Sequence, residues 1–186
     1  MWLRKLSVPG KVMLSGEYAV LYGGTALVVP VPRFLHVMET DAHPQIRVSP
    51  VLAAAARYKI PEIADFENNR SFASVAVDNS NFFDVGRDGR RCKIGLGCSA
   101  AETAGIVAVR FERAGWPWSE NAETIARYAE KIHFEIQGGL GSGADVVCCT
   151  LRRPIKYRRE MAGYRVEKID FDANNDASGR NPHRKT

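Results

Sequence analysis

The chain has 186 residues, 45% hydrophobic and 25% charged, which is enough for one sizeable core, or for one domain and part of another. It has no run of about 18 apolar residues, "MWLRKLSVPGK" lacks the apolar core of an export signal, and its four cysteines form no C-x-x-C pair. We therefore expect a cytoplasmic protein with reduced thiols, with no membrane span, disulfide framework or zinc site.

The net charge of +5 lies in residues 151–186, because residues 1–150 hold 16 basic and 16 acidic side chains. A nucleic-acid binder more often carries a basic stripe across its folded body. A solvated basic strand and tail explain this pattern better. We expect no nucleic-acid partner, and binding of DNA or RNA stays the weaker alternative.

The first half of the chain is predicted to contain mainly short strands. "LRKLSV" and "KVMLSG" are separated by Pro9-Gly10, and "TALVVPVP" and "RFLHVMET" meet near Pro32-Arg33, after a turn at Gly23-Gly24. "QIRVS" and "SFASVAV" are further strand candidates. "PVLAAAARYK" is predicted to be helical, with its proline in the first turn, whereas residues 61–70 and "DVGRDGRR" are predicted to be loops.

The second half is predicted to hold two long helices. The first runs from Ser99 to Arg113 and is apolar nearly all round, so we expect it to be buried. The second is amphipathic up to Ile136, with Ser119 as its N-cap. Strands over "PIKYRRE" and "YRVEKIDF" follow, and residues 171–186 form a polar tail that we expect to be disordered. This mixture indicates an α+β or α/β domain over residues 1–170.

"KIGLGCSAAETAG" places glycines directly before the buried helix. Glycines let a ligand approach the backbone, and the first N–H groups of a helix are unpaired and lie at the positive end of its dipole. The stretch therefore indicates a phosphate cradle. A tight turn with a small-residue helix contact explains it about equally well, and neither the Walker nor the dinucleotide glycine pattern is met.

Two further stretches carry candidate catalytic residues. In "QGGLGSGADVV", Asp145 follows four glycines and could act as a base or orient a cation, although an aspartate that caps a short helix is the simpler explanation. In "PGKVMLSGEYAV", Lys11 could reach a phosphate as a point charge, although a surface lysine at the start of a strand is the simpler explanation.

Taken together and in this order, the three stretches resemble the GHMP kinase family. "KIGLGCSAA" and "QGGLGSGADVVCCTLRRPIKYRR" look most like phosphomevalonate kinases, and "GEYAVLYGG" looks like the opening motif of mevalonate kinases. The resemblance covers most of residues 3–170. It implies a two-layer α+β N-terminal domain with a mixed sheet and helices packed on one face.

The resemblance also implies a function, which is phosphoryl transfer from Mg-ATP to a small-molecule acceptor, phosphomevalonate or mevalonate. Asp145 and Lys11 would be catalytic and would lie close together, and Ser99 would lie near Mg²⁺. The ATP phosphates would be held by Lys93, Gly95, Leu96, Gly97, Cys98, Ser99, Ala100 and Ala101. The acceptor would be bound by Gly16, Glu17, Tyr18, Gln137, Ser142 and Gly143.

The chain departs from the family pattern in several ways. Cys98-Ser99 replaces the usual Ser-Ser, which predicts a reactive, low-pKa thiol at a helix N-terminus. Neither Glu130 nor Glu135 fits the spacing of the family's metal-binding glutamate. The family's C-terminal domain is missing, so the chain would be either a half-enzyme that needs a partner chain or an inactive nucleotide-binding relative. His133 is expected to be a structural histidine rather than a ligand of the acceptor.

Overall fold

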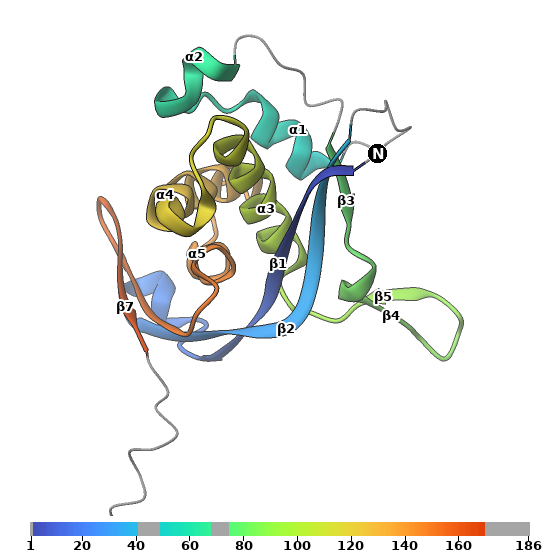
Figure 1. The fold of residues 1–186 in the computed structure, drawn as a ribbon. Coiled ribbons are helices and arrows are strands. Elements are labelled where there is room, and N and C mark those ends of the chain that lie inside the picture. The colour runs from blue at the N-terminus through green and yellow to red at the C-terminus, as the bar shows by residue number, and fades with distance from the viewer. Residues whose placement is uncertain (1, 41–48, 68–74, 170–186) are drawn as a thin grey trace, which may run out of the picture.

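The computed structural model describes residues 2–40, 49–67 and 75–169, which form a sheet with helices packed on one face (Figure 1). The strand order is β1-β2-β6-β7, with β3 paired to the C-terminal half of β2. The strands are β1 (Trp2–Ser15), β2 (Thr25–Thr40), β3 (Val75–Asp78), β6 (Ile155–Glu160) and β7 (Gly163–Lys168). The α+β class is confirmed, but every pairing of described strands is antiparallel, where a mixed sheet was expected.

The two longest strands were each predicted as a pair of short ones, and that prediction is wrong. β1 continues through Pro9-Gly10, where its pairing with β2 shifts register so that Pro9 lies opposite Phe34 and Gly10 opposite Val31. Pro32 and Arg33 of β2 therefore form a bulge across from Pro9-Gly10. A bulge accepts a proline because the lost N–H is not needed in the ladder, so these residues bend the strands without ending them.

Shorter elements complete the domain. The helix predicted over residues 50–59 is confirmed as α1 (Pro50–Arg57), but a 3-10 turn (Pro61–Ile63) and α2 (Ala64–Glu67) replace part of the loop predicted over residues 61–70. The loop predicted over "DVGRDGRR" is wrong at its ends, which lie in a hairpin of β4 (Phe83–Val85) and β5 (Arg91–Lys93); residues 86–90 connect the two strands. Residues 45–48 of "QIRVS", residues 71–74 of "SFASVAV" and the tail lie outside the described residues.

Three helices build the core against the sheet: α3 (Cys98–Arg113), α4 (Trp118–Ile136) and α5 (Ala144–Leu151). The predicted burial of α3 is confirmed, because its residues from Ala100 to Phe111 are all buried. At Gly105 an added Cβ would lie 2.5 Å from Val37 and 2.8 Å from Val8, so only glycine lets α3 approach the sheet this closely. No helix among the described residues is long and apolar enough to cross a membrane.

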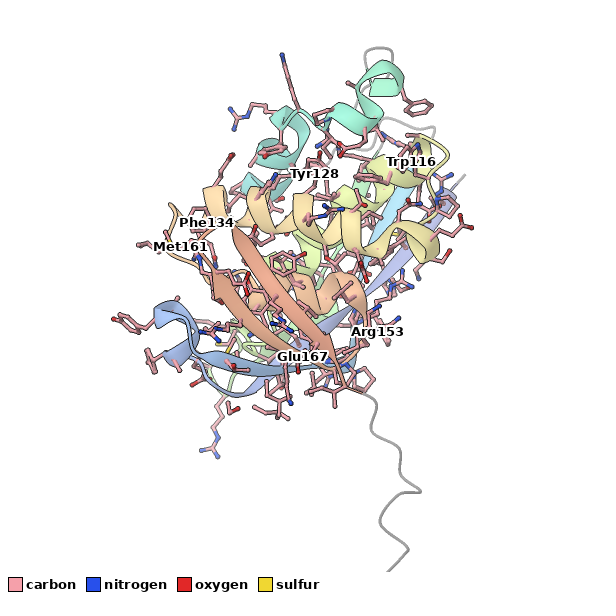
Figure 2. The ribbon with its side chains drawn as sticks, turned by 90° about the vertical axis from the view of Figure 1, so that its left-hand side faces the viewer. Trp116, Tyr128, Phe134, Arg153, Met161 and Glu167 are labelled. Carbon is pink, nitrogen blue, oxygen red and sulfur yellow. The ribbon has the colours of Figure 1, made fainter. Side chains whose placement is uncertain are left out.

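Two details of the helices matter for the site. Ser119 is not the N-cap of α4: the helix begins at Trp118, whose N–H donates to the Glu112 carboxylate at 2.7 Å. Figure 2 shows the β6–β7 hairpin lying beside α4, with Phe134 of the helix near the hairpin turn that carries Met161. Arg159 stacks over the Phe134 ring at 4.6 Å, which holds the hairpin against the helix.

Candidate active site

The first glycine loop, Lys93–Gly97 (loop one), runs from β5 into α3 and is fastened to β1. Gly95 and Gly97 both adopt positive φ, and Gly97 is the N-cap of α3 without any side-chain cap. The Lys11 N–H donates to the Leu96 carbonyl at 3.0 Å. Because no side chain caps the helix, the first amides of α3 keep their free donors at the positive end of its dipole.

Lys11 joins this loop to the start of α5. An added Cβ at Gly97 would lie 2.9 Å from the Lys11 Cε, so the lysine stem runs directly beneath loop one. The Lys11 ammonium forms an ion pair with the Asp145 carboxylate, with Nζ and Oδ2 2.8 Å apart. The lysine side chain is only 12% exposed, so solvent screens the pair less than it screens surface ion pairs.

The second glycine loop, Gln137–Gly143 (loop two), places Asp145 in the first turn of α5. Its last residue, Gly143, has a φ of +85° and is the N-cap of α5 without a side-chain cap. The Tyr157 hydroxyl donates to the Ser142 carbonyl and the Arg159 guanidinium donates to the Gly141 carbonyl. An acidic side chain at this position is favoured by the helix dipole, and β6 braces the loop that leads to it.

A cavity of about 400 Å³ lies where Lys11 and Asp145 meet. Five of the six residues predicted to bind the acceptor line it, namely Glu17, Tyr18, Gln137, Ser142 and Gly143. The sixth, Gly16, does not: an added Cβ would lie 2.2 Å from the Thr25 carbonyl oxygen, so this glycine permits a tight contact with β2. Met13, Leu21 and His133 also line the cavity, and no simple sequence signal marks the first two.

His133 is the most informative residue that sequence reasoning set aside. It is only 2% exposed, and its Nε2 lies 3.3 Å from the Ser99 hydroxyl. Burial lowers the pKa of His133, although Asp145 opposes this effect; Lys11 lowers it further. Its position four residues after the buried Ala129, on the apolar face of α4, was a signal that this imidazole faces inward.

The residues of the predicted ATP loop divide into two groups. Gly95, Leu96, Gly97 and Ser99 surround the start of α3, and Lys93 is exposed at the end of β5. The Ala100 and Ala101 side chains are buried in the core, which leaves only their backbone for a ligand. The larger cavity between α4 and β7, of about 540 Å³, contains none of the predicted site residues.

The prediction of a low-pKa thiol at Cys98 is wrong. Burial of the sulfur raises its pKa, and the nearby Glu102 carboxylate adds to the rise, which outweighs the opposing effect of Lys93. Cys98 therefore holds less thiolate at neutral pH than a free cysteine does.

Among residues 2–40, 49–67 and 75–169, no group of three or more His, Cys, Asp or Glu side chains could hold a metal ion. Glu130 packs behind loop two, where an added Cβ at Gly143 would lie 2.6 Å from its Cγ, and Glu135 is exposed. Neither glutamate lines the 400 Å³ cavity.

Comparison with known proteins identifies the fold. No family model matches the sequence, and no curated protein matches it. The phosphomevalonate kinase of Streptococcus pneumoniae, solved with phosphomevalonate and AMPPNP, matches 90% of this chain and 59% of its own at 14% identity and a TM-score of 0.67. The Methanococcus jannaschii mevalonate kinase matches 90% of this chain and 56% of its own, at 17% identity and a TM-score of 0.60. A Lin0012 protein from Listeria innocua matches 83% of this chain and 48% of its own, at 21% identity and a TM-score of 0.61.

The chain spans about half the length of the solved structures it matches. Identities this low establish the fold alone. That fold is an α+β architecture shared with phosphomevalonate and mevalonate kinases, and it agrees with the fold that the resemblance in the sequence implies.

Proposed function

We propose that residues 1–170 form the N-terminal domain of a GHMP-family small-molecule kinase. In this proposal, loop one and the start of α3 bind the phosphates of Mg-ATP, and the 400 Å³ cavity binds the acceptor. The observation that carries the proposal is the Lys11–Asp145 ion pair, which lies beneath loop one and also lines the acceptor cavity. A cation and an acid are thus adjacent to both candidate sites.

Phosphoryl transfer depends mostly on positioning and electrostatic stabilisation. The free amides of α3 suit phosphate oxygens, and the Lys11 ammonium suits negative charge that develops on the transferred group. If the acceptor is a hydroxyl, Asp145 takes its proton. If the acceptor is already a phosphate, no base is needed, and Asp145 orients Lys11 and the acceptor.

Magnesium would reduce the charge repulsion between the nucleotide phosphates and the incoming acceptor. Mg²⁺ prefers oxygen ligands and usually takes only one or two from the protein when it binds with phosphates. The Ser99 hydroxyl fits this role because it lies in the first turn of α3, where it can donate a hydrogen bond to His133 Nε2 and leave its oxygen lone pairs for the metal. The described residues offer no ready-made cage of acidic ligands, which agrees with a metal that arrives with the nucleotide.

For the acceptor we propose phosphomevalonate, with mevalonate as the next candidate. One solved structure of this fold holds phosphomevalonate together with AMPPNP, and two others are mevalonate kinases. The opening and second-loop motifs of the sequence support the same pair of substrates. Glu17, Tyr18, Gln137 and Ser142 would contact the acceptor from the cavity wall.

The second candidate function is a half-enzyme that works with a partner chain, or a relative that binds nucleotide without turnover. The chain spans about half of the structures it resembles. Kinase activity that appears only when a C-terminal half is added would favour the half-enzyme. Nucleotide binding without turnover under both conditions would favour the inactive relative.

Titration of Mg-ATP into the purified chain by calorimetry tests the proposal. We expect saturable binding that Ser99→Ala weakens. Turnover is then measured over a panel of acceptors, with and without a supplied C-terminal half. Lys11→Met and Asp145→Asn should each reduce turnover by at least about a hundredfold and leave Mg-ATP binding in place; turnover that survives both substitutions would refute the assigned roles.

A further inference from the structure

Two buried polar atoms lack a hydrogen-bond partner, and both belong to residues that line the same cavity. Within the described part of the chain, His133 Nδ1 and Asp145 Oδ1 are the buried side-chain nitrogen or oxygen atoms without a partner. Both residues line the 400 Å³ acceptor cavity. Buried polar groups in native proteins are almost always paired, so a histidine with only a structural role would be expected to have both ring nitrogens bonded. The pairing of these two orphans points to a ligand.

The hydrogen bond to Ser99 limits what His133 can offer. A neutral imidazole has one donor nitrogen and one acceptor nitrogen. If Nε2 accepts a hydrogen bond from the Ser99 hydroxyl across the 3.3 Å contact, then Nδ1 carries the N–H. This tautomer directs the Ser99 proton away from any cation at the start of α3, and it gives the cavity a donor instead of a second acceptor beside the Asp145 carboxylate.

We propose that His133 is a binding residue for the phosphoryl acceptor, whose oxygen accepts a hydrogen bond from Nδ1–H. The inference rests on the proposed function, since it needs the cavity to hold the acceptor. The acceptor is favoured over the nucleotide because no residue of loop one is among those that line the cavity, whereas Glu17, Tyr18 and Gln137 are. His133 thereby connects the two substrates, because Nε2 contacts Ser99 at the start of α3, where the nucleotide would bind, and Nδ1 contacts the acceptor.

Substitution of His133 by asparagine or by glutamine distinguishes the role of Nδ1 from that of Nε2. The side-chain amide of asparagine can occupy the place of Nδ1, and that of glutamine can occupy the place of Nε2. We expect His133→Gln to keep the Ser99 contact and to weaken binding of phosphomevalonate about tenfold or more, as the loss of a hydrogen bond to a charged group predicts. We expect His133→Asn to keep most of the acceptor affinity.

The experiment measures calorimetric affinities for Mg-ATP, phosphomevalonate and mevalonate, together with ¹⁵N NMR of the histidine ring, assigned by comparison with His133→Phe. Support requires an Nδ1–H tautomer whose Nδ1 resonance shifts when an acceptor is added, and the expected contrast between Gln and Asn. Equal acceptor affinity in wild type and His133→Gln, or the opposite tautomer, would overturn the proposal. If the wild type binds Mg-ATP but neither acceptor, the acceptor part of the proposed function fails, and this inference fails with it.

Discussion

The two glycine loops look alike in sequence but are held in different ways. Each ends in a glycine of positive φ that caps a helix without a side-chain partner. Loop one is held through its backbone, by the Lys11 N–H on the Leu96 carbonyl. Loop two has its carbonyls bound by Tyr157 and Arg159 from β6. The difference suggests a division of roles, in which loop one keeps its backbone available for a ligand and loop two is braced to fix a side chain.

The acid behind each loop continues this contrast. Asp145, at the start of α5, has the Lys11 ammonium at 2.8 Å. Glu102, in α3, is 5% exposed and accepts the Ser49 hydroxyl proton as a hydrogen bond. Burial raises the pKa of Glu102, although the Ser49 hydrogen bond and Lys93 oppose the rise. The two acids therefore differ in their surroundings, since Asp145 is paired with a cation and Glu102 is buried beside a hydroxyl.

The largest effect is expected at the cap of loop two. In Gly143→Ala the new Cβ would lie 2.6 Å from the Glu130 Cγ, at a φ of +85° that only glycine adopts readily. The strained backbone and the overpacked contact together should cost about 3 kcal/mol in the free energy of unfolding, measured by urea denaturation. Gly138→Ala is the matched control, since its φ is +65° with nothing within 4 Å, and it should cost about 1 kcal/mol. Equal costs would mean that loop two is not braced at Gly143.

The corresponding change in loop one should affect binding more than stability. In Gly97→Ala the new Cβ would press on the Lys11 stem at 2.9 Å from Cε. Because that stem is flexible, the cost in unfolding should stay near 1–2 kcal/mol, but loop one must shift to relieve the contact, and this shift moves the first amides of α3. We expect Mg-ATP affinity to fall about tenfold, a change of about 1.4 kcal/mol.

Gly95→Ala provides the control for loop one. Its φ of +79° is similar, and nothing lies within 4 Å of an added Cβ. Gly95→Ala should be destabilised by backbone strain alone, and it should retain more Mg-ATP affinity than Gly97→Ala. If calorimetry gives the two variants the same affinity, the packing of loop one on the Lys11 stem does not position the amides that would bind the nucleotide.

The start of α3 and the class of fold could be predicted from the sequence, because both follow from local patterns of glycine, alanine and apolar residues. Glycines before an apolar run predicted the start of α3 near Ser99, and alanines predicted α1. The same local rules failed at Pro9-Gly10, because the register shift that accommodates the proline depends on the partner strand β2. The meeting of Lys11 with Asp145, 134 positions apart in the sequence, came from the family resemblance and not from any local pattern.

Residues of the acceptor cavity show the same limit. Tyr18 and Gln137 were assigned through motifs, whereas His133 was assigned a structural role because one histidine near a helix end is usually structural. Its unpaired Nδ1 becomes visible only when α4 is packed against α3 and α5. Burial on the helix face was predictable from spacing; the missing partner was not.

Glu102→Gln tests the contrast between the two acids. Because the folded-state pKa of Glu102 is raised above 4.5, its ionisation favours the unfolded state as pH rises, and the stability that the protonated form contributes is lost at neutral pH. Glutamine keeps the shape and can still accept the Ser49 hydroxyl. We expect a higher Tm than wild type at pH 7 and little difference below pH 4.5, measured by thermal unfolding across pH. A lower Tm at pH 7 would indicate that Glu102 is stabilised as a charged group.

The smallest effect concerns the thiol at the start of α3. Cys92 is exposed, Cys98 is half-buried with a raised pKa, and Cys148 has its pKa raised by burial to about 12. Since the thiolate is the reactive form, iodoacetamide at pH 7.5 should label Cys92 first, then Cys98, and Cys148 and Cys149 only after unfolding, as followed by mass spectrometry of peptides. Mg-ATP should slow labelling of Cys98 relative to Cys92 if the nucleotide covers loop one. Faster labelling of Cys98 than of Cys92 would mean that the positive end of the α3 dipole lowers the thiol pKa by more than burial raises it. The start of α3 would then activate the Cys98 side chain.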